Sequence, residues 1–155
     1  MAVEIERKFL LSSDEWRTQI DHSICMRQGY LSCTESSAIR VRIENEQAHI
    51  NVKKSLDGIH RLEYEYGIPL DDAEEMLDKI AIRPIIEKTR HEIRIGKHLW
   101  EIDEFLGDNK GLIVAEIELG SADEVFERPD WIGKEVSQDT RYFNSSLIEQ
   151  PFCLW

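Results

Sequence analysis

Residues 3–10 read VEIERKFL, and their side chains alternate in character, as the side chains of a β-strand alternate between two faces. One face carries Glu4, Glu6 and Lys8. The opposite face carries aliphatic residues and a phenylalanine, and only Arg7 interrupts it. Such a charged face is either the solvated side of a sheet or part of a site for metal ions and phosphate groups. The rest of the sequence helps to decide between these two readings.

The composition indicates one globular domain over residues 1–155, since 41% of the residues are hydrophobic and 32% are charged. A formal net charge of −12 argues against nucleic acid or an anionic membrane as a partner, but it does not exclude an anionic substrate in a local basic pocket. Three cysteines without metal-ligand spacing, and a start without an apolar run, favour a cytoplasmic protein with no membrane partner.

The pattern of two-residue alternation recurs along the chain and predicts a mostly antiparallel α+β domain. The predicted strands are residues 3–10, 26–31, 38–44, 49–55, 61–68, 86–95, 99–106 and 112–119. Helices are predicted over residues 12–20, 70–82 and 121–127. The last fifteen residues are expected to pack back on the body of the domain.

The polar faces of these strands consist almost entirely of ionisable residues, and acids and bases segregate by strand. Acidic pairs are Glu4/Glu6, Glu63/Glu65, Glu101/Asp103 and Glu116/Glu118, basic pairs are Arg40/Arg42 and Lys88/Arg90, and Lys8 and Lys53 are single cations. For any one strand a solvated face is the ordinary interpretation. Like charges two residues apart repel unless something lies between them, however, and phosphate with divalent metal ions would supply that partner.

These faces converge only if the sheet closes. An eight-stranded barrel has an interior about wide enough for side chains or one small ligand. The alternatives at this point are an ordinary sheet with a wet face and a barrel with a charged interior, its apolar faces covered by helices outside.

The motifs resemble the CYTH superfamily, also called triphosphate tunnel metalloenzymes. EIERKF resembles the family signature E-x-E-x-K, and RQGYL, IRVRI, VKKS, RLEYEY, IEKTRHEI, EIDEF, AEIEL and DTRYFN follow in the family's order. The length and the RQGYL and DTRYFN segments most resemble the short bacterial inorganic triphosphatases. The resemblance implies an eight-stranded antiparallel β-barrel that forms a tunnel, with charged side chains inside, helices outside, and Mg²⁺ or Mn²⁺ as cofactor.

The resemblance also implies roles for individual residues. Substrate phosphates are expected to bind Lys8, Arg40, Arg42, Lys53, Lys88, Arg90 and Arg141. Metal ions are expected to bind Glu4, Glu6, Glu63, Glu65, Asp103, Glu116 and Glu118. Lys8 and Tyr30 are the expected catalytic residues. Tyr30 is either a proton acceptor or a residue of the tunnel wall, because a tyrosine hydroxyl ordinarily titrates near pH 10.

The expected reaction is metal-dependent hydrolysis of inorganic triphosphate to diphosphate and phosphate. One alternative is an enzyme of the same fold that acts on an organic triphosphate, such as a nucleoside or thiamine triphosphatase or an adenylate cyclase. Another is a polyphosphate-binding module without turnover, against which the full set of acids argues. A small anionic triphosphate is the expected partner, and a homodimer is the alternative to a monomer.

Overall fold

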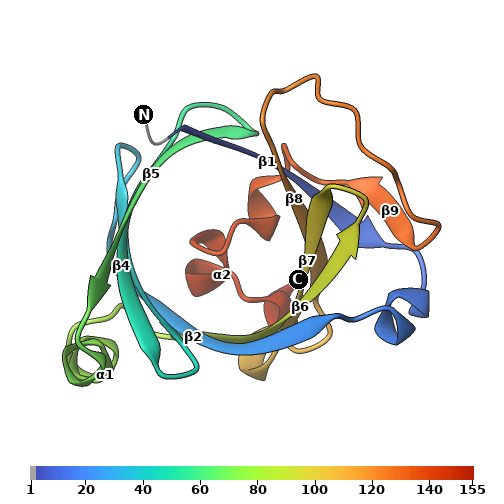
Figure 1. The fold of residues 1–155 in the computed structure, drawn as a ribbon. Helices are drawn as coiled ribbons and strands as arrows, with labels where there is room; N and C mark the ends of the chain where they lie inside the picture. Colours follow the sequence, from blue (N-terminus) through green and yellow to red (C-terminus); the bar gives the residue numbers. More distant parts are fainter. Residues whose placement is uncertain (1–2) are drawn as a thin grey trace.

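The computed structural model describes residues 3–155, which form nine β-strands and two short α-helices (Figure 1). The strands are β1 (Val3–Leu11), β2 (His22–Cys33), β3 (Ala38–Glu44), β4 (Gln47–Ser55), β5 (His60–Ile68), β6 (Ile86–Ile95), β7 (His98–Phe105), β8 (Ile113–Leu119) and β9 (Ile132–Glu135). The helices are α1 (Leu70–Lys79) and α2 (Ser146–Glu149). None of the helices within residues 3–155 combines the length and the apolar character needed to cross a lipid bilayer.

Strands β1 to β8 close into an antiparallel barrel, as predicted. The strand order is β5-β4-β3-β2-β6-β7-β8-β1, and β1 pairs again with β5 through Val3↔Leu62 and Ile5↔His60. Figure 1 looks along the barrel and shows the closed ring. The eight predicted strands are all present, and β2 differs most because it begins at His22 rather than at residue 26.

Strand β9 is an addition that the sequence did not predict. It pairs with the end of β1 through Phe9↔Glu135 and Leu11↔Ile132. One edge of β1 therefore pairs with β5 near its start and with β9 near its end, while its other edge pairs with β8. This arrangement makes β1 the strand that joins the barrel to its outer layer.

Two apolar clusters lie outside the barrel, and another fills one end of its interior. One cluster packs the outward residues of β1, β7 and β8, among them Phe9 and Trp100, against Trp16 and Trp131. A second cluster packs α1 on β3 and β4. A third joins the barrel to the C-terminal segment, residues 140–155. The prediction of an inside-out arrangement, with helices on the apolar outer surface, is confirmed for α1.

Two helix predictions need correction. The segment 12–20 contains only a 3₁₀ turn, Glu15–Thr18. The segment 121–127 forms a turn at residues 122–123 followed by irregular chain, and its side chains contact the barrel. Glu124 accepts hydrogen bonds from the Gly120 amide and His98, and the Phe126 ring packs edge-on against Trp100.

Candidate active site

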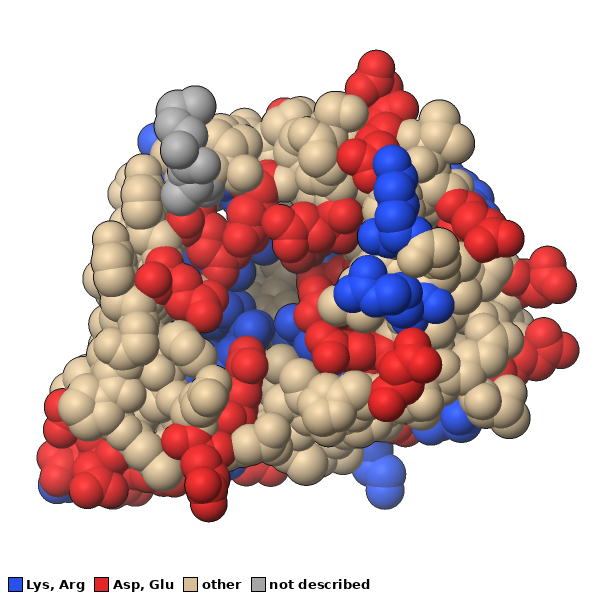
Figure 2. Space-filling view, viewed as in Figure 1, with Lys and Arg blue, Asp and Glu red and all other residues tan. Residues whose placement is uncertain are grey.

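The charged faces of the strands meet inside the barrel around one cavity of about 300 Å³. Figure 2 shows this hollow with acidic side chains around its mouth and basic side chains deeper inside. Every predicted site residue except Asp103 and Arg141 lines the cavity, namely Glu4, Glu6, Lys8, Tyr30, Arg40, Arg42, Lys53, Glu63, Glu65, Lys88, Arg90, Glu116 and Glu118. The ionisable positions thus form one site.

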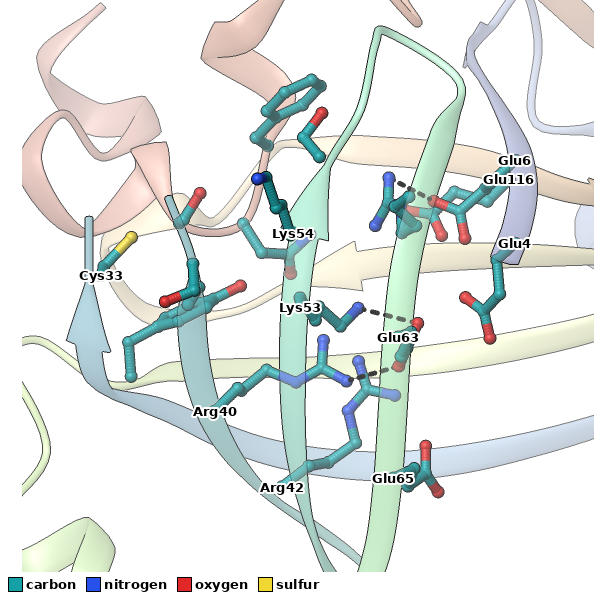
Figure 3. Close-up of a pocket in the computed structure, with 18 of the residues that line it drawn as sticks. Glu4, Glu6, Cys33, Arg40, Arg42, Lys53, Lys54, Glu63, Glu65 and Glu116 are labelled. Atoms are coloured by element: carbon teal, nitrogen blue, oxygen red, sulfur yellow. Dashed lines mark ion pairs between the residues drawn. The ribbon is translucent and has the colours of Figure 1, made fainter. Parts of the chain in front are cut away.

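Arg40 is buried and Lys53 is partly buried, and both cations have few partners (Figure 3). The side chain of Arg40 is 4% exposed, its Nη2 atom lies 3.9 Å from Glu63, and its Nε atom has no hydrogen-bond partner within residues 3–155. Lys53 Nζ lies 3.3 Å from the other Glu63 oxygen. Burial, together with the Arg40 charge, lowers the pKa of Lys53 to about 7. An anion in the cavity would satisfy both groups.

Lys88 and Arg90 on β6 share one buried counter-ion, Asp103 on β7. Asp103 accepts hydrogen bonds from Lys88 Nζ at 2.7 Å, Arg90 Nε at 2.8 Å and Arg90 Nη2 at 2.9 Å. Burial alone would raise the pKa of Asp103, but Arg90 and Lys88 lower it to about 2. Asp103 is 1% exposed and lies behind the cavity wall. Its oxygens already have protein partners, so the geometry favours positioning of the two cations over metal binding.

The acids of β1 and β8 crowd together because these strands are neighbours. The register places Glu6 opposite Glu118 and Lys8 opposite Glu116. Burial, Glu63 and Glu118 raise the pKa of Glu4 to about 8, and burial and Glu116 raise the pKa of Glu6. Lys8 and Arg90, by contrast, outweigh burial and hold the pKa of Glu116 well below its usual range. The shortage of positive charge is therefore at Glu4 and Glu6, and a cation beside them would relieve the repulsion.

The donor set fits a hard divalent cation. All the crowded acids offer carboxylate oxygens, which Mg²⁺ and Mn²⁺ prefer. No three His, Cys, Asp or Glu side chains within residues 3–155 come close enough together to enclose a metal ion. Mg²⁺ usually binds through one or two carboxylates and completes its shell with water and substrate phosphate. Pairs of acids around an anion site match that mode.

Tyr30 lies at the cavity, whereas Arg141 lies away from it. Tyr30 on β2 is 4% exposed and lines the cavity opposite Arg40 in the β2–β3 pairing, which is compatible with both of its predicted roles. Arg141 does not line the cavity. Its side chain is 59% exposed and donates to Asp139, with Nη2 2.8 Å from that carboxylate. A substrate contact is therefore least supported for Arg141.

Two residues of the site are missing from the sequence analysis: Arg61 lines the cavity, and Asn51 supports two of the acids that line it. Arg61 Nη2 lies 3.3 Å from Glu6, and Asn51 donates to Glu63 and Glu65. Arg61 has the same phase on its strand as Glu63 and Glu65, so the alternation could have revealed it. Asn51 lies on the inward face of β4, opposite Glu65 in the β4–β5 register, but a neutral amide gives no charge signal for a phosphate or metal site.

Comparisons with known proteins match almost the whole chain. The CYTH domain family matches residues 2–151. A protein of Acetivibrio thermocellus named inorganic triphosphatase is 44% identical over 98% of this chain and 97% of its own length. Its namesake in Nitrosomonas europaea is 36% identical over 93% and 95%. A solved crystal structure of an inorganic triphosphatase superposes with a TM-score of 0.67 at 33% identity, and it covers 96% of this chain and 95% of its own.

Proposed function

The chain belongs to the CYTH domain family, and on that premise we propose that it hydrolyses inorganic triphosphate to diphosphate and phosphate inside the charged cavity. The observation that carries the proposal is the cluster of buried cations, including the incompletely paired Arg40, inside a chain with a net charge of −12. Cations gathered against the overall charge indicate an anionic ligand. Two relatives named inorganic triphosphatase, similar over nearly the full chain, support the choice of anion.

The cavity size also favours a bare phosphate chain. A volume of about 300 Å³ is at the lower end of the range for small-molecule sites. Most of the residues that line the cavity are charged or polar, which suits phosphate oxygens better than a nucleobase. Arg40 and Arg42 project from neighbouring positions of β3, and Lys53, Lys88 and Arg90 from the adjoining walls. Together they would hold the phosphate oxygens of a short chain, the arginines by paired N–H donors.

Glu4, Glu6, Glu116 and Glu118 would hold Mg²⁺ or Mn²⁺, with Glu63 and Glu65 as further ligands. When bound, such an ion neutralises phosphate charge and activates water for in-line attack at phosphorus.

Lys8 lies next to these acids, with Nζ 3.4 Å from Glu116. Its ammonium group would stabilise charge on the phosphate under attack, and Lys88 and Arg90 would stabilise charge on the diphosphate that leaves. Tyr30 would either accept a proton from water or shape the wall beside Arg40.

The test measures phosphate release from tripolyphosphate, pyrophosphate, ATP and thiamine triphosphate with Mg²⁺, with Mn²⁺ and with a chelator. We expect fast release from tripolyphosphate that the chelator abolishes, and little from the others. Faster release of phosphate from an organic triphosphate would make that compound the preferred substrate. Formation of cyclic AMP from ATP would indicate a cyclase. Tight binding of tripolyphosphate without release would leave a binding module.

Arg40→Lys tests whether Arg40 binds a substrate phosphate. It keeps the charge and removes the planar donor fork, so KM for tripolyphosphate should rise by about tenfold. Arg83→Lys, the same exchange at an exposed arginine beside Asp78, is the control and should leave KM unchanged. Equal KM values for both variants would contradict phosphate binding by Arg40.

A further inference from the structure

The C-terminal segment, residues 140–155, lies across one end of the barrel. Figure 1 shows it inside the ring when the barrel is viewed end-on, and Figure 2 shows that the hollow ends on uncharged atoms. Phe143, Asn144 and Ser145 line the cavity there. Leu147 and Ile148 anchor the segment in an apolar cluster of inward-facing strand residues at this end of the barrel. One end of the cavity thus has an acidic mouth, and the other is bounded by this segment.

The segment contacts both lysines that point toward it. Lys8 Nζ donates to the Tyr142 carbonyl at 3.1 Å and lies 5.4 Å from the centre of the Phe143 ring. Lys88 Nζ donates to Asn144 Oδ1 at 3.1 Å. Because both lysines are proposed to bind phosphate, the segment lies at the end of the phosphate-binding surface.

The orientation of the Asn144 amide follows from its partners. Lys88 can only donate, so the atom that faces it must be the carbonyl oxygen. Gln28 Nε2 donates to the same oxygen at 2.9 Å. With Oδ1 held by two donors, the Asn144 amide keeps its NH₂ group on the other side. That group can donate to a phosphate oxygen at the end of a chain.

We propose that the C-terminal segment sets the length of phosphate chain that the site accepts: Asn144 donates to the terminal phosphate, and Phe143 removes the room for a fourth. This inference rests on the proposed function and deepens it. It makes the substrate a chain of three phosphates held by one end. Longer polyphosphates become poor substrates because the segment blocks one end of the cavity and the acidic mouth repels further phosphates at the other.

The first experiment compares kcat/KM for tripolyphosphate and tetrapolyphosphate with Mg²⁺. The wild type should prefer tripolyphosphate. Phe143→Ala makes room at the end of the cavity and should raise the ratio of tetrapolyphosphate to tripolyphosphate kcat/KM by about tenfold or more. Phe152→Ala is the matched control: the same truncation in the same segment, at a half-buried phenylalanine that packs against Trp155 away from the cavity. An unchanged ratio in Phe143→Ala, or the same change in both variants, would overturn the proposal.

The second experiment uses Asn144→Asp, which keeps the shape and the acceptor for Lys88 and Gln28 but replaces the NH₂ donor with a charged oxygen. KM for tripolyphosphate should rise by about tenfold, since like charges in contact are strongly unfavourable. A thermal melt checks that the variant is folded. If KM of the folded variant matches the wild type, Asn144 does not meet the terminal phosphate.

The two proposals fail in different ways. A wild type that releases no phosphate from tripolyphosphate would refute the proposed function. A wild type that hydrolyses tripolyphosphate, tetrapolyphosphate and long-chain polyphosphate with similar kcat/KM would keep the function and refute the length limit.

Discussion

Asp103 shows how a charged residue can serve a phosphate site without touching it. Its two oxygens fix the side chains of Lys88 and Arg90 from behind the cavity wall. Such a buried counter-ion reduces the repulsion between two cations that must face the same anion. Removing one partner of a buried ion cluster leaves uncompensated charge in a place that water does not reach.

Asp103→Asn should therefore destabilise the fold. The amide keeps the shape but not the charge, and the free energy of unfolding should fall by about 3 kcal/mol, as for other buried pairs that lose one partner. Urea denaturation measures it. Glu104→Gln on the same strand is the control, because the Glu104 pair with Arg17 lies at the surface and should contribute less than about 1 kcal/mol. Similar losses in the two variants would show that Asp103 is not the buried counter-ion described here.

The sequence pattern predicted which residues point inward, but not how each is used. Glu101 and Asp103 share a phase on β7, yet Glu101 lines the cavity and Asp103 does not. Alternation predicts which face of the strand a side chain is on. It does not predict how far along the barrel axis the side chain lies or which residues of other strands it contacts. Alternation does place Arg61 inside the barrel, since it lies on the same strand face as Glu63.

Among the elements, β9 could not be predicted because its four residues, IGKE, have no repeated alternation and include a glycine. Its position depends on a contact across the chain. Arg7, the exception on the apolar face of β1, donates to Glu135 of β9 through Nε at 2.9 Å and through Nη2 at 2.6 Å. The hydrogen bonds from Arg7 lower the pKa of Glu135.

Glu135→Gln should reduce stability in a pH-dependent way. The folded pKa of Glu135 lies below its ordinary value of about 4.5, so the pair stabilises the fold above that value and the contribution is lost as the pH falls through the folded pKa. At pH 7 we expect a loss of about 0.5–1 kcal/mol, given the partial exposure. Thermal melts from pH 7 to pH 3 should show the two proteins converging in acid. A difference that is constant with pH would contradict the ion pair.

Gly29 lets α1 approach β2. A Cβ atom there would lie 2.8 Å from Ala81 Cβ and 3.0 Å from Leu77 Cδ2. Gly29→Ala should lower the free energy of unfolding by about 1–3 kcal/mol through overpacking. Gly67→Ala is the matched control, since no atom lies within 4 Å of its added methyl group, and it should be neutral or slightly stabilising. Equal effects would mean that the helix can move aside.

At the scale of the whole molecule, the alternation of charged and apolar residues left an open sheet and a barrel as alternatives, and the resemblance to the CYTH superfamily implied the barrel that the structure shows. The position of the C-terminal segment did not follow from the sequence. Its apolar residues, such as Leu147 and Ile148, indicated packing on the body of the domain. No periodicity within the segment specifies which end of a barrel it will cross.

A charged interior predicts strong stabilisation by ligand. The folded state holds cations such as Arg40 and Lys53 close together, and the unfolded chain does not, so an anion binds only the folded form. Tripolyphosphate with Mg²⁺ at about 100 times its dissociation constant should add about 2.7 kcal/mol. Thermal melts measure it, with sodium chloride of equal ionic strength as control. An equal shift in the control would assign the effect to screening rather than to a site.

The double pairing of β1 also bears on how the protein is made. Ribosomes release β1 before the other strands, yet its partners β8 and β9 span residues 113–135. Contacts so distant along the chain form slowly and late. Among β1 to β9, the first strand to be made is thus the last to be fully paired, and the face that carries Glu4, Glu6 and Lys8 stays open to water until β8 and β9 have been made.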